Sequence, residues 1–272
     1  MKKKAQATRT SKVLIFGAAG SIGGELVRQL HKKHTIYAVD TNETGVNDLY
    51  VDYGVVGRVG DIRDYDTVND IFSDFTPDIV YQCAAYKHVN QMEIVPLEAI
   101  KTNCIGHYNV LHCAKRYEVP KLVFTSTDKV VNAKSVMGKT KSLAETMTVN
   151  QGYTAVRFGN VLGSHGSVIP IWQRQMDSAR PITVTDDRAE RYMMTIEEAV
   201  ELMIEAGENS KGGEVWILDM PKKVNVLELA KHIAKDHPIE MIGLRPGETL
   251  EEELMSVEEK QRAKKVGRFF VL

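Results

Sequence analysis

The sequence predicts an α/β fold in which a doubly wound parallel sheet is followed by a smaller C-terminal lobe. Apolar runs typical of buried strands alternate with amphipathic helical segments through the first two thirds of the 272 residues. That alternation favours a parallel sheet covered by helices on both faces. A glycine-rich turn joins the first apolar run to the first helical segment, and loop-rich pieces after residue 157 predict the smaller lobe.

The individual elements follow from the spacing of apolar residues. Short apolar runs predict strands at residues 13–16, 35–40, 57–62, 78–85, 121–127, 153–158 and 214–220. Apolar residues that recur three or four positions apart predict helices at residues 21–31, 96–116, 136–150, 196–206 and 226–235. We divide the chain into a basic arm at 1–11, a sheet domain at 12–160, and a lobe at 161–272 that is interleaved with the sheet. The charged stretch at 251–265 is interpreted as a solvated helix face.

Composition argues against several classes of partner. The formal net charge is −1 and 26% of the residues are charged, so the chain lacks the basic character of most proteins that bind nucleic acid or anionic lipid. The basic start leads directly into "VLIFGAAG" without an apolar signal core, and the sequence has no apolar run of the about 18 residues that a membrane span needs. We expect neither secretion nor a membrane span.

Cysteine and histidine usage indicates a reducing compartment and no metal site. Cys83, Cys104 and Cys113 lack a Cys-x-x-Cys spacing and lie in apolar stretches, which favours buried thiols over disulfides. None of the eight histidines has a metal-ligand spacing with a second histidine or an acid. We therefore expect a cytoplasmic protein without a bound metal.

A dinucleotide-binding signature lies at the start of the predicted sheet. "VLIFGAAGSIGGELV" places Gly17, Gly20 and Gly23 between a strand and a helix, as in the phosphate-binding turn of a Rossmann-type domain. The helix N-terminus offers free N–H groups to a pyrophosphate. Asp40 ends the second predicted strand, where a carboxylate can accept hydrogen bonds from ribose hydroxyls. Asp40 favours NAD over NADP, although the next loop has N–H groups that could serve a ribose phosphate.

A second group of polar residues follows the fifth strand. "KLVFTSTDK" delivers Thr127, Asp128 and Lys129 to the carboxyl edge of the sheet, where ligands bind in open α/β folds. The next helix carries Met137 and Lys141 on one face, four residues apart. In a large class of oxidoreductases the first of these positions holds a tyrosine base, and a thioether cannot take a proton. A nucleotide-binding protein without catalytic activity is therefore one hypothesis.

The segment "STDKVVNAKSVMGKTKSLAE", residues 126–145, resembles the nucleotide-sugar 4,6-dehydratases of polysaccharide and glycan biosynthesis, a branch of the extended short-chain dehydrogenase/reductase superfamily. It is most similar to the members that act on UDP-N-acetylglucosamine, which characteristically have Asp-Lys at this position. One branch of these members has methionine in place of the tyrosine. The blocks "CAAYKHVNQMEIVPLEAIKTNCIG", "VRFGNVLGSHGSVIPIWQRQ", "RYMMTIEEAVELMIEAG" and "GLRPGE" follow in the family's order. Ala133 stands where the family often has proline. No membrane-spanning region precedes the domain as it does in some relatives, so we expect a stand-alone soluble form.

The resemblance implies a cycle in which NAD(P) takes hydride from C4 of the sugar, water is eliminated across C5 and C6, and hydride returns to C6. It implies that Lys129 is the base at C5, that Asp128 is the acid at O6, and that Thr127 hydrogen-bonds the C4 oxygen. Burial would lower the pKa of Lys129 and raise that of Asp128. The route of the C4 hydroxyl proton stays open among these three residues and water, because Met137 replaces the tyrosine.

The resemblance also implies the binding residues. The predicted catalytic residues are Thr127, Asp128, Lys129, Met137 and Lys141. The predicted cofactor-binding residues are Gly17, Ala19, Gly20, Ser21, Ile22, Gly23, Asp40, Asp61, Ile62, Cys83, Ala84, Ala85, Lys87, Asn103, Thr125 and Lys141. The predicted substrate-binding residues are Lys87, His88, Asn160, Val161, Ser167, Val184, Arg191, Arg245 and Glu248.

Several alternatives remain at this stage. Glu248 is expected to pair with Arg245, although a surface arginine is as often solvated as it is a ligand clamp. The cofactor is NAD or NADP, held tightly and recycled, and the stereochemistry at C5 is open. By analogy with this fold the protein is expected to be a homo-oligomer. A nucleotide-sugar 4-epimerase or reductase and a non-catalytic nucleotide-sugar sensor are the competing functions.

Overall fold

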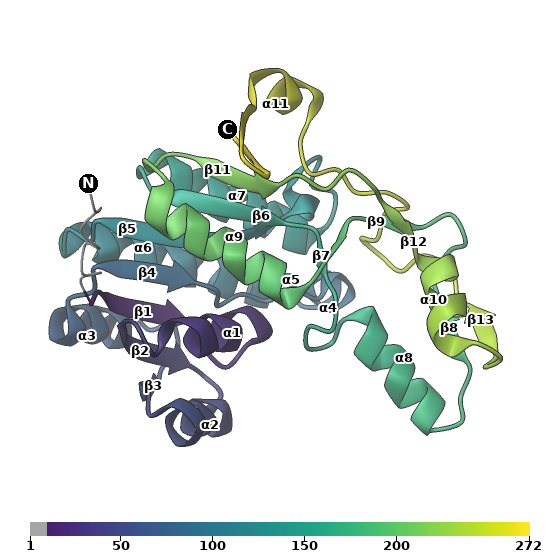
Figure 1. The fold of residues 1–272 in the computed structure, drawn as a ribbon, viewed down its shortest axis with the longest axis horizontal. Coiled ribbons are helices and arrows are strands. Elements are labelled where there is room, and N and C mark those ends of the chain that lie inside the picture. Colours follow the sequence, from purple (N-terminus) through teal and green to yellow (C-terminus); the bar gives the residue numbers. More distant parts are fainter. Residues whose placement is uncertain (1–9) are drawn as a thin grey trace, which may run out of the picture.

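A nine-stranded sheet forms the centre of the computed structural model, which describes residues 10–272 (Figure 1). Most of the predicted basic arm at 1–11 lies outside the described residues. The strands of the sheet are β1 Lys12–Phe16, β2 Thr35–Asp40, β3 Val56–Val59, β4 Ile79–Gln82, β5 Lys121–Thr127, β6 Thr154–Phe158, β11 Val215–Leu218, β14 Lys264–Val266 and β15 Phe269–Val271. Their order is β14-β15-β11-β6-β5-β4-β1-β2-β3. The strands from β11 to β3 run parallel, whereas β15 pairs antiparallel with both β11 and β14.

Short strands and the helices complete the fold. The strand pairs are β7 Asn160–Val161 with β10 Met193–Met194, β9 Glu190–Arg191 with β12 Val224–Asn225, and β8 Ile182–Val184 with β13 Ile239–Met241. The helices are α1 Ser21–Leu30, α2 Glu43–Tyr53, α3 Tyr65–Phe75, α4 Val89–Ile94, α5 Pro96–Ala99, the π-helix η1 Ile100–Gly106, α6 His107–Arg116, the 3₁₀ turn η2 Asp128–Val130, α7 Val136–Asn150, α8 Val168–Asp177, α9 Ile196–Asn209, α10 Val226–Ala234 and α11 Val257–Arg262.

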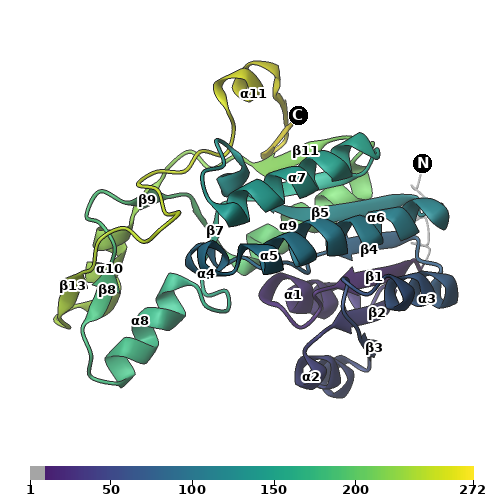
Figure 2. The ribbon, with the colours of Figure 1, turned by 180° about the vertical axis from the view of Figure 1, so that it is seen from behind.

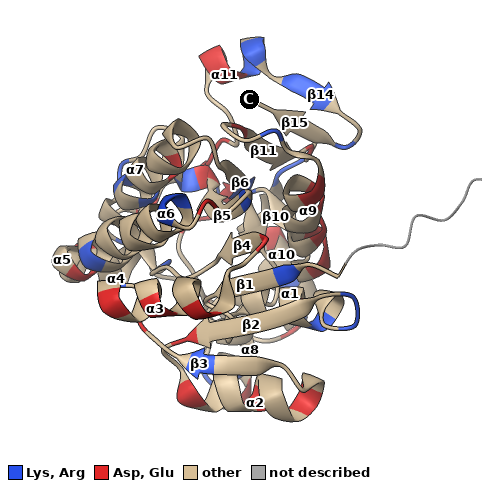
Figure 3. Cartoon of the chain, turned by 90° about the vertical axis from the view of Figure 1, so that its left-hand side faces the viewer, with Lys and Arg blue, Asp and Glu red and all other residues tan. Residues whose placement is uncertain are grey.

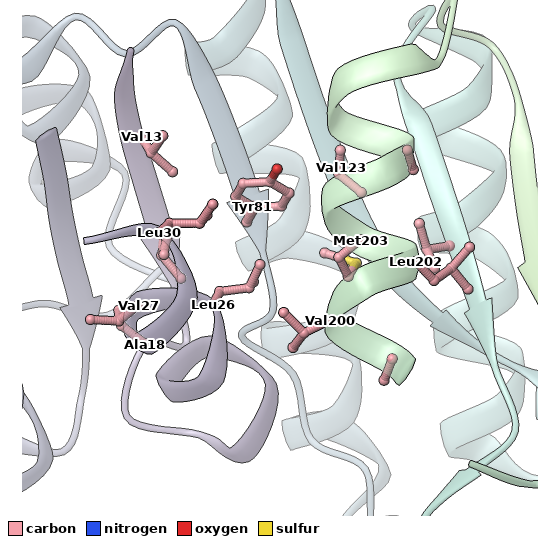
Figure 4. Close-up of a cluster of buried hydrophobic side chains, with 14 of the residues drawn as sticks. Val13, Ala18, Leu26, Val27, Leu30, Tyr81, Val123, Val200, Leu202 and Met203 are labelled. Carbon is pink, nitrogen blue, oxygen red and sulfur yellow. The ribbon is translucent and has the colours of Figure 1, made fainter. Parts of the chain in front are cut away.

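Helices cover both faces of the sheet, as the sequence predicts for a doubly wound fold. On one face α1, α2 and α9 pack on the strands, with Leu26 and Leu30 of α1 and Val200 and Met203 of α9 in the core (Figure 4). On the opposite face, seen from behind in Figure 2, α3, α6 and α7 pack on the strands. Burial on both faces explains why β5 reads as a nearly continuous apolar run.

The smaller lobe has an apolar core of its own. Trp172 of α8, Ile182 and Val184 of β8, and Ala230 and Ala234 of α10 form this cluster. In Figure 1 these elements lie to one side of the sheet domain. The chain after residue 161 also returns to the sheet, because β11, β14 and β15 extend it. The carboxyl ends of the parallel strands point toward the lobe (Figure 1).

Two predictions about local structure need correction. The segment predicted as one helix at 96–116 continues through α5, η1 and α6, so a π-helical stretch interrupts the α-helical hydrogen bonding. The charged stretch at 251–265 is not a solvated helix face. Glu252, Leu254 and Met255 are buried, and α11 covers only residues 257–262. Carboxylates of this segment pair with buried basic groups of the sheet domain, which favours burial over solvation.

The distribution of charged residues agrees with the nearly neutral composition. In Figure 3, segments with Lys or Arg alternate with segments with Asp or Glu around the sheet. Among residues 10–272, no helix is both long enough and apolar enough to span a membrane.

Candidate functional site

Each of the three glycines after β1 meets a different structural requirement. Gly17 has a φ of +76°, and a Cβ there would lie 2.6 Å from the backbone nitrogen of Ala84. A Cβ on Gly23 would collide with the carbonyl oxygen of Gly17, so this glycine lets α1 pack on β1. A Cβ on Gly20 would meet only that carbonyl oxygen, at 3.2 Å, and Gly20 lines a cavity. Gly20 is thus the position at which a ligand can approach the backbone closely.

Asp40 supports this glycine loop from the end of β2. Its Oδ2 accepts a hydrogen bond from the Ala19 N–H at 3.0 Å, and its Oδ1 accepts one from the Asn42 N–H at 3.0 Å. Further along the same edge, Asp61 pairs with Arg63, and Ile62 is buried against Gly106. Asp40 and Asp61 keep their carboxylates at the sheet edge, and both bond to neighbouring groups of their own chain.

A first cavity of about 600 Å³ opens at the carboxyl edge of the sheet. It is lined by the glycine loop, the segment after β4, the end of β5, α7, and the loop that leads from β6 to α8. Seventeen of the predicted site residues line it: Gly17, Gly20, Ser21, Ile22, Gly23, Cys83, Ala85, Lys87, His88, Thr125, Thr127, Lys129, Met137, Lys141, Asn160, Val161 and Ser167. Segments far apart in the sequence therefore meet at one site.

Loops from both parts of the chain close this cavity. The Lys87 ammonium donates a hydrogen bond to Ser164 Oγ at 3.4 Å, and a Cβ on Gly166 would lie 2.6 Å from the His88 ring. The His165 N–H donates to Ser21 Oγ at 2.9 Å. Burial lowers the pKa of Lys87, and burial together with the Lys87 charge lowers that of His88.

A second cavity of about 740 Å³ adjoins the first. Lys129 and Asn160 line both cavities, whereas Asp128, Arg191 and Glu252 line only the second. The two cavities thus meet at the residues that follow β5 and β6.

Lys129 lies at the centre of a charged cluster at this junction. Its Nζ donates to Asp128 Oδ1 at 3.0 Å, to Glu252 Oε2 at 2.8 Å and to Asn160 Oδ1 at 3.2 Å. Burial alone would lower the pKa of Lys129, but the two carboxylates outweigh burial and raise it. The prediction of a lowered pKa for Lys129 is therefore wrong, because it did not include the second carboxylate.

Asp128 is 1% exposed and lies directly behind Thr127. The Thr127 hydroxyl lines the first cavity and donates to Asp128 Oδ1 at 2.9 Å. Burial, aided by Glu252 and opposed by Lys129, raises the pKa of Asp128 to about 6, as predicted in direction. Asp128 Oδ2 is buried and has no hydrogen-bond partner among the described residues. This carboxyl group can change its protonation state near neutral pH.

Met137 and Lys141 lie on the cavity side of α7. Met137 is buried and packs with Met92 and Ala99. The Lys141 ammonium donates to the carbonyl oxygen of Thr125 and lies 4.0 Å from the centroid of the Phe124 ring. Burial lowers the pKa of Lys141 to about 7. Lys141 can therefore change between an ammonium and a free amine near neutral pH at this wall of the cavity, whereas Met137 supplies only apolar surface.

The comparisons with known proteins fit this geometry. A family model described as "Polysaccharide biosynthesis protein" matches residues 13–272. The chain belongs to this polysaccharide biosynthesis protein family. The family is part of the extended short-chain dehydrogenase/reductase superfamily, as the resemblance in residues 126–145 implies.

Three known proteins illustrate what this chain is similar to. The chain is 40% identical over 91% of its length to the capsular polysaccharide biosynthesis protein CapD of Staphylococcus aureus, of which it covers 45%. It is 30% identical to a UDP-glucose 4-epimerase of Rickettsia bellii, over 95% of this chain and 81% of that protein. The X-ray structure of Pen from Bacillus thuringiensis matches 98% of this chain and 87% of its own, with a TM-score of 0.92 and 34% identity. The chain thus spans about half the length of the first of these relatives.

Eleven of the predicted site residues do not line the first cavity. They are Ala19, Asp40, Asp61, Ile62, Ala84, Asn103, Asp128, Val184, Arg191, Arg245 and Glu248.

Asn103 of η1 exchanges two hydrogen bonds with the backbone of Tyr86, at 2.8 and 3.0 Å, so it holds the segment after β4 in place. Val184 lies in the core of the lobe. Both contribute to the framework of the site.

Arg191 and Arg245 make contacts in the structure that the sequence does not predict. The Arg191 guanidinium is occupied by the carbonyl oxygens of Glu190, Thr249 and Leu250, and its Nε lies 3.6 Å from Glu252. Glu248 accepts a hydrogen bond from the backbone N–H of Arg245 at 3.1 Å, and no ion pair joins the two side chains in the described structure. The expected Arg245–Glu248 salt bridge is therefore replaced by a local turn contact.

Sequence reasoning missed two carboxylates of the C-terminal segment, the buried Glu252 and the half-buried Glu259. Glu252 reaches Lys129, and Glu259 reaches Arg157 of β6 at 2.9 Å. Arg157 also pairs with Glu145 of α7 at 2.6 Å, and Glu145 in turn accepts a hydrogen bond from Ser126. The run "EEEL" contains no pattern that separates Glu252 from its exposed neighbours, so no signal in the sequence could have identified it.

Proposed function

We propose that this protein is a nucleotide-sugar 4,6-dehydratase that acts on UDP-N-acetylglucosamine and uses a nicotinamide dinucleotide. The observation that carries the proposal is that Thr127 and Lys129 line the first cavity and both contact Asp128 behind it, while Met137 stands in this cavity where a tyrosine base is expected. Oxidation of the C4 alcohol needs one base. A further acid and a further base are needed only if water is then eliminated. Membership of a polysaccharide biosynthesis family supports a nucleotide-sugar substrate.

The residues of the first cavity fit the proposed cofactor. Gly20 leaves space at the N-terminus of α1, and among the described residues no side chain caps that helix. The start of α1 would hold the pyrophosphate, Asp40 the adenosine ribose, and Lys141 the nicotinamide ribose. Structures that resemble this fold include a 4,6-dehydratase of Bacillus anthracis with NAD, but they do not separate NAD from NADP for this chain.

The chemistry assigns one task to each residue at the junction. A bound nicotinamide dinucleotide supplies hydride transfer, first from C4 of the sugar and later back to C6. Thr127 takes the C4 hydroxyl proton and passes its own hydroxyl proton to the Asp128 carboxylate at 2.9 Å. The free amine of Lys129 removes the C5 proton, and Asp128 gives its new proton to the C6 hydroxyl, which leaves as water. Lys129 then returns its proton to C5, so that the only net loss is one water.

The rest of the site would hold the nucleotide. Asn160 and Ser167 line the first cavity, and Ser167 precedes α8 with a buried hydroxyl that has no partner in residues 10–272. A diphosphate needs N–H and hydroxyl donors of this kind. Arg245 would approach the diphosphate or the uridine from the loop before Glu248.

The proposed assembly is a homo-oligomer. Ile94, Leu97, Ile105 and Leu143 expose between 51% and 71% of their surface on α4, α5, η1 and α7. Apolar side chains gathered in this way often mark a contact between subunits. Sedimentation analysis would measure the size of the particle.

The function is tested by incubating the purified protein with UDP-N-acetylglucosamine and following the sugar by mass spectrometry and proton NMR. Loss of one water and a new C6 methyl signal are expected. A sugar of unchanged mass but inverted at C4 would favour a 4-epimerase, which the Rickettsia relative represents. An unchanged sugar with every nucleotide sugar tried would favour a non-catalytic nucleotide-binding protein.

Substitution of Gly20 should separate cofactor binding from folding. A Gly20→Val side chain would project into the first cavity, so we expect the affinity for NAD and NADP to fall about 10-fold or more. A Cβ at Gly24, one turn along α1, would make only an ordinary contact at 3.5 Å. Gly24→Ala should therefore bind as the unmodified protein does. Calorimetric titration measures both variants, and equal affinity for both would contradict the assignment.

Dehydration should fall in acid because of Asp128. This residue must be ionised to receive the C4 hydroxyl proton, and its pKa is raised to about 6. As the pH falls through about 6 the carboxylate is protonated, so the rate should drop about 10-fold for each further pH unit. The initial rate of water loss between pH 5 and pH 8 gives this profile. A rate that rises as the pH falls would show that Asp128 starts the cycle as an acid.

A further inference from the structure

Glu252 is brought to the active site from the far end of the chain. Its Oε2 lies 2.8 Å from Lys129 Nζ although 123 residues separate the two in the sequence. The Glu252 residue is 8% exposed, and its other carboxylate oxygen lies 3.6 Å from Arg191 Nε. A buried carboxylate that contacts a proposed base is positioned to control the protonation state of that base.

The ion pair presents a chemical difficulty for the proposed cycle. Lys129 is an ammonium in the resting protein, since both Asp128 and Glu252 stabilise its charge. An ammonium cannot remove the C5 proton of a sugar. Asp128 becomes neutral when it receives the C4 hydroxyl proton, and Glu252 is then the remaining carboxylate in contact with Lys129 among the described residues.

We propose that Glu252 is a positioning residue that controls the protonation of Lys129: it holds the ammonium in the resting protein and accepts one of its protons during the reaction. In this step one Lys129 N–H bond breaks and one Glu252 O–H bond forms, which converts the ion pair into a neutral amine and a neutral acid. Exclusion of water favours the neutral pair, because burial penalises both charged forms. The proton returns to Lys129 after C5 has been reprotonated. The inference rests on the proposed dehydratase function.

The charged groups that face Glu252 come from two distant elements of the chain. Asp128 and Lys129 face it from η2, and Arg191 faces it from β9. Lys134 and Glu248 line the same cavity. Arg191 stabilises the anion in the resting state, and burial of the carboxyl is outweighed by Lys129 and Arg191, which lower the pKa of Glu252.

The first test needs no substrate. Competitive acetylation with trace acetic anhydride, followed by mass spectrometry of the Lys129 peptide, gives the pH at which Lys129 loses its proton. In Glu252→Gln this midpoint should fall by about one to three pH units, because a contacting opposite charge is lost. Glu251→Gln is the matched control, since Glu251 is the exposed neighbour and pairs with Lys223. An unchanged midpoint in Glu252→Gln would overturn the proposal.

The second test uses turnover. The rate of water loss by the unmodified protein should not rise between pH 7 and pH 9, since the proton moves within the pair and Lys141, with a pKa of about 7, can only lose charge in this window. Glu252→Gln should lose about 100-fold in kcat at pH 7 and gain a rate that rises with pH, whereas Glu252→Asp should restore part of kcat and remove the rise. A uniform loss without a pH slope would reduce Glu252 to a structural role and overturn the proposal. If the unmodified protein dehydrates no nucleotide sugar, the proposed function fails, and the acetylation midpoint still decides whether Glu252 controls Lys129.

Discussion

Replacing Lys129 by methionine should reduce the dehydration of UDP-N-acetylglucosamine by at least about 1000-fold, because the base at C5 is removed. Methionine keeps the length and the apolar stem of the side chain. It leaves Asp128 and Glu252 without the ammonium that lies 3.0 and 2.8 Å from them. The product assay by mass spectrometry measures the loss, and titration with NAD and NADP checks that cofactor binding persists.

The control for this variant is Lys139→Met. Lys139 is an exposed residue of α7, so the same chemical change should leave turnover intact. A non-catalytic protein would make a different prediction, in which Lys129→Met and Lys139→Met are equally harmless. Full activity in Lys129→Met would therefore remove Lys129 from the mechanism.

Replacing Arg157 by methionine should destabilise the fold by about 3–5 kcal/mol, because it leaves the buried Glu145 and the half-buried Glu259 without their partner. The Arg157 side chain is 3% exposed, and its guanidinium holds Glu145 at 2.6 Å and Glu259 at 2.9 Å. It thereby ties α7 and the C-terminal segment to β6. For a domain of this size we expect the melting temperature to fall by roughly 10 °C. Differential scanning calorimetry measures the change.

A matched arginine substitution separates burial from charge. Arg188 pairs with Asp186 at 2.9 Å, but the Arg188 side chain is 69% exposed. Exposed ion pairs contribute little to stability, so Arg188→Met should leave the melting temperature nearly unchanged. Similar melting curves for the two variants would show that the Arg157 cluster does not anchor the C-terminal segment.

The sequence predicts the part of the site that depends on local pattern. Gly17, Gly20 and Gly23 are recognisable because the turn between a strand and a helix has positions where a side chain would prevent close packing or ligand approach. Thr127 and Lys129 are recognisable because parallel strands bring their carboxyl ends to one edge. Packing of helices on both faces follows from apolar runs in the same way.

The rest of the site depends on contacts between distant segments. Glu252 is equivalent to Glu251 and Glu253 in the sequence, and only the path of the C-terminal segment across the sheet edge buries it. That contact also reverses the expected pKa direction of Lys129. The Arg191 guanidinium, whose substrate contact stays a prediction, donates hydrogen bonds to backbone carbonyl groups of the loop at 249–250. Spacing and residue type carry no information on such tertiary partners.

The most direct test of the proposed function follows one hydrogen atom. The protein is incubated with UDP-N-acetylglucosamine that carries deuterium at C4, and the product is examined by NMR and mass spectrometry. A 4,6-dehydratase should yield a sugar that has lost one water and carries the deuterium in its C6 methyl group. A sugar that keeps both its water and the deuterium at C4, with or without inversion there, would contradict the account.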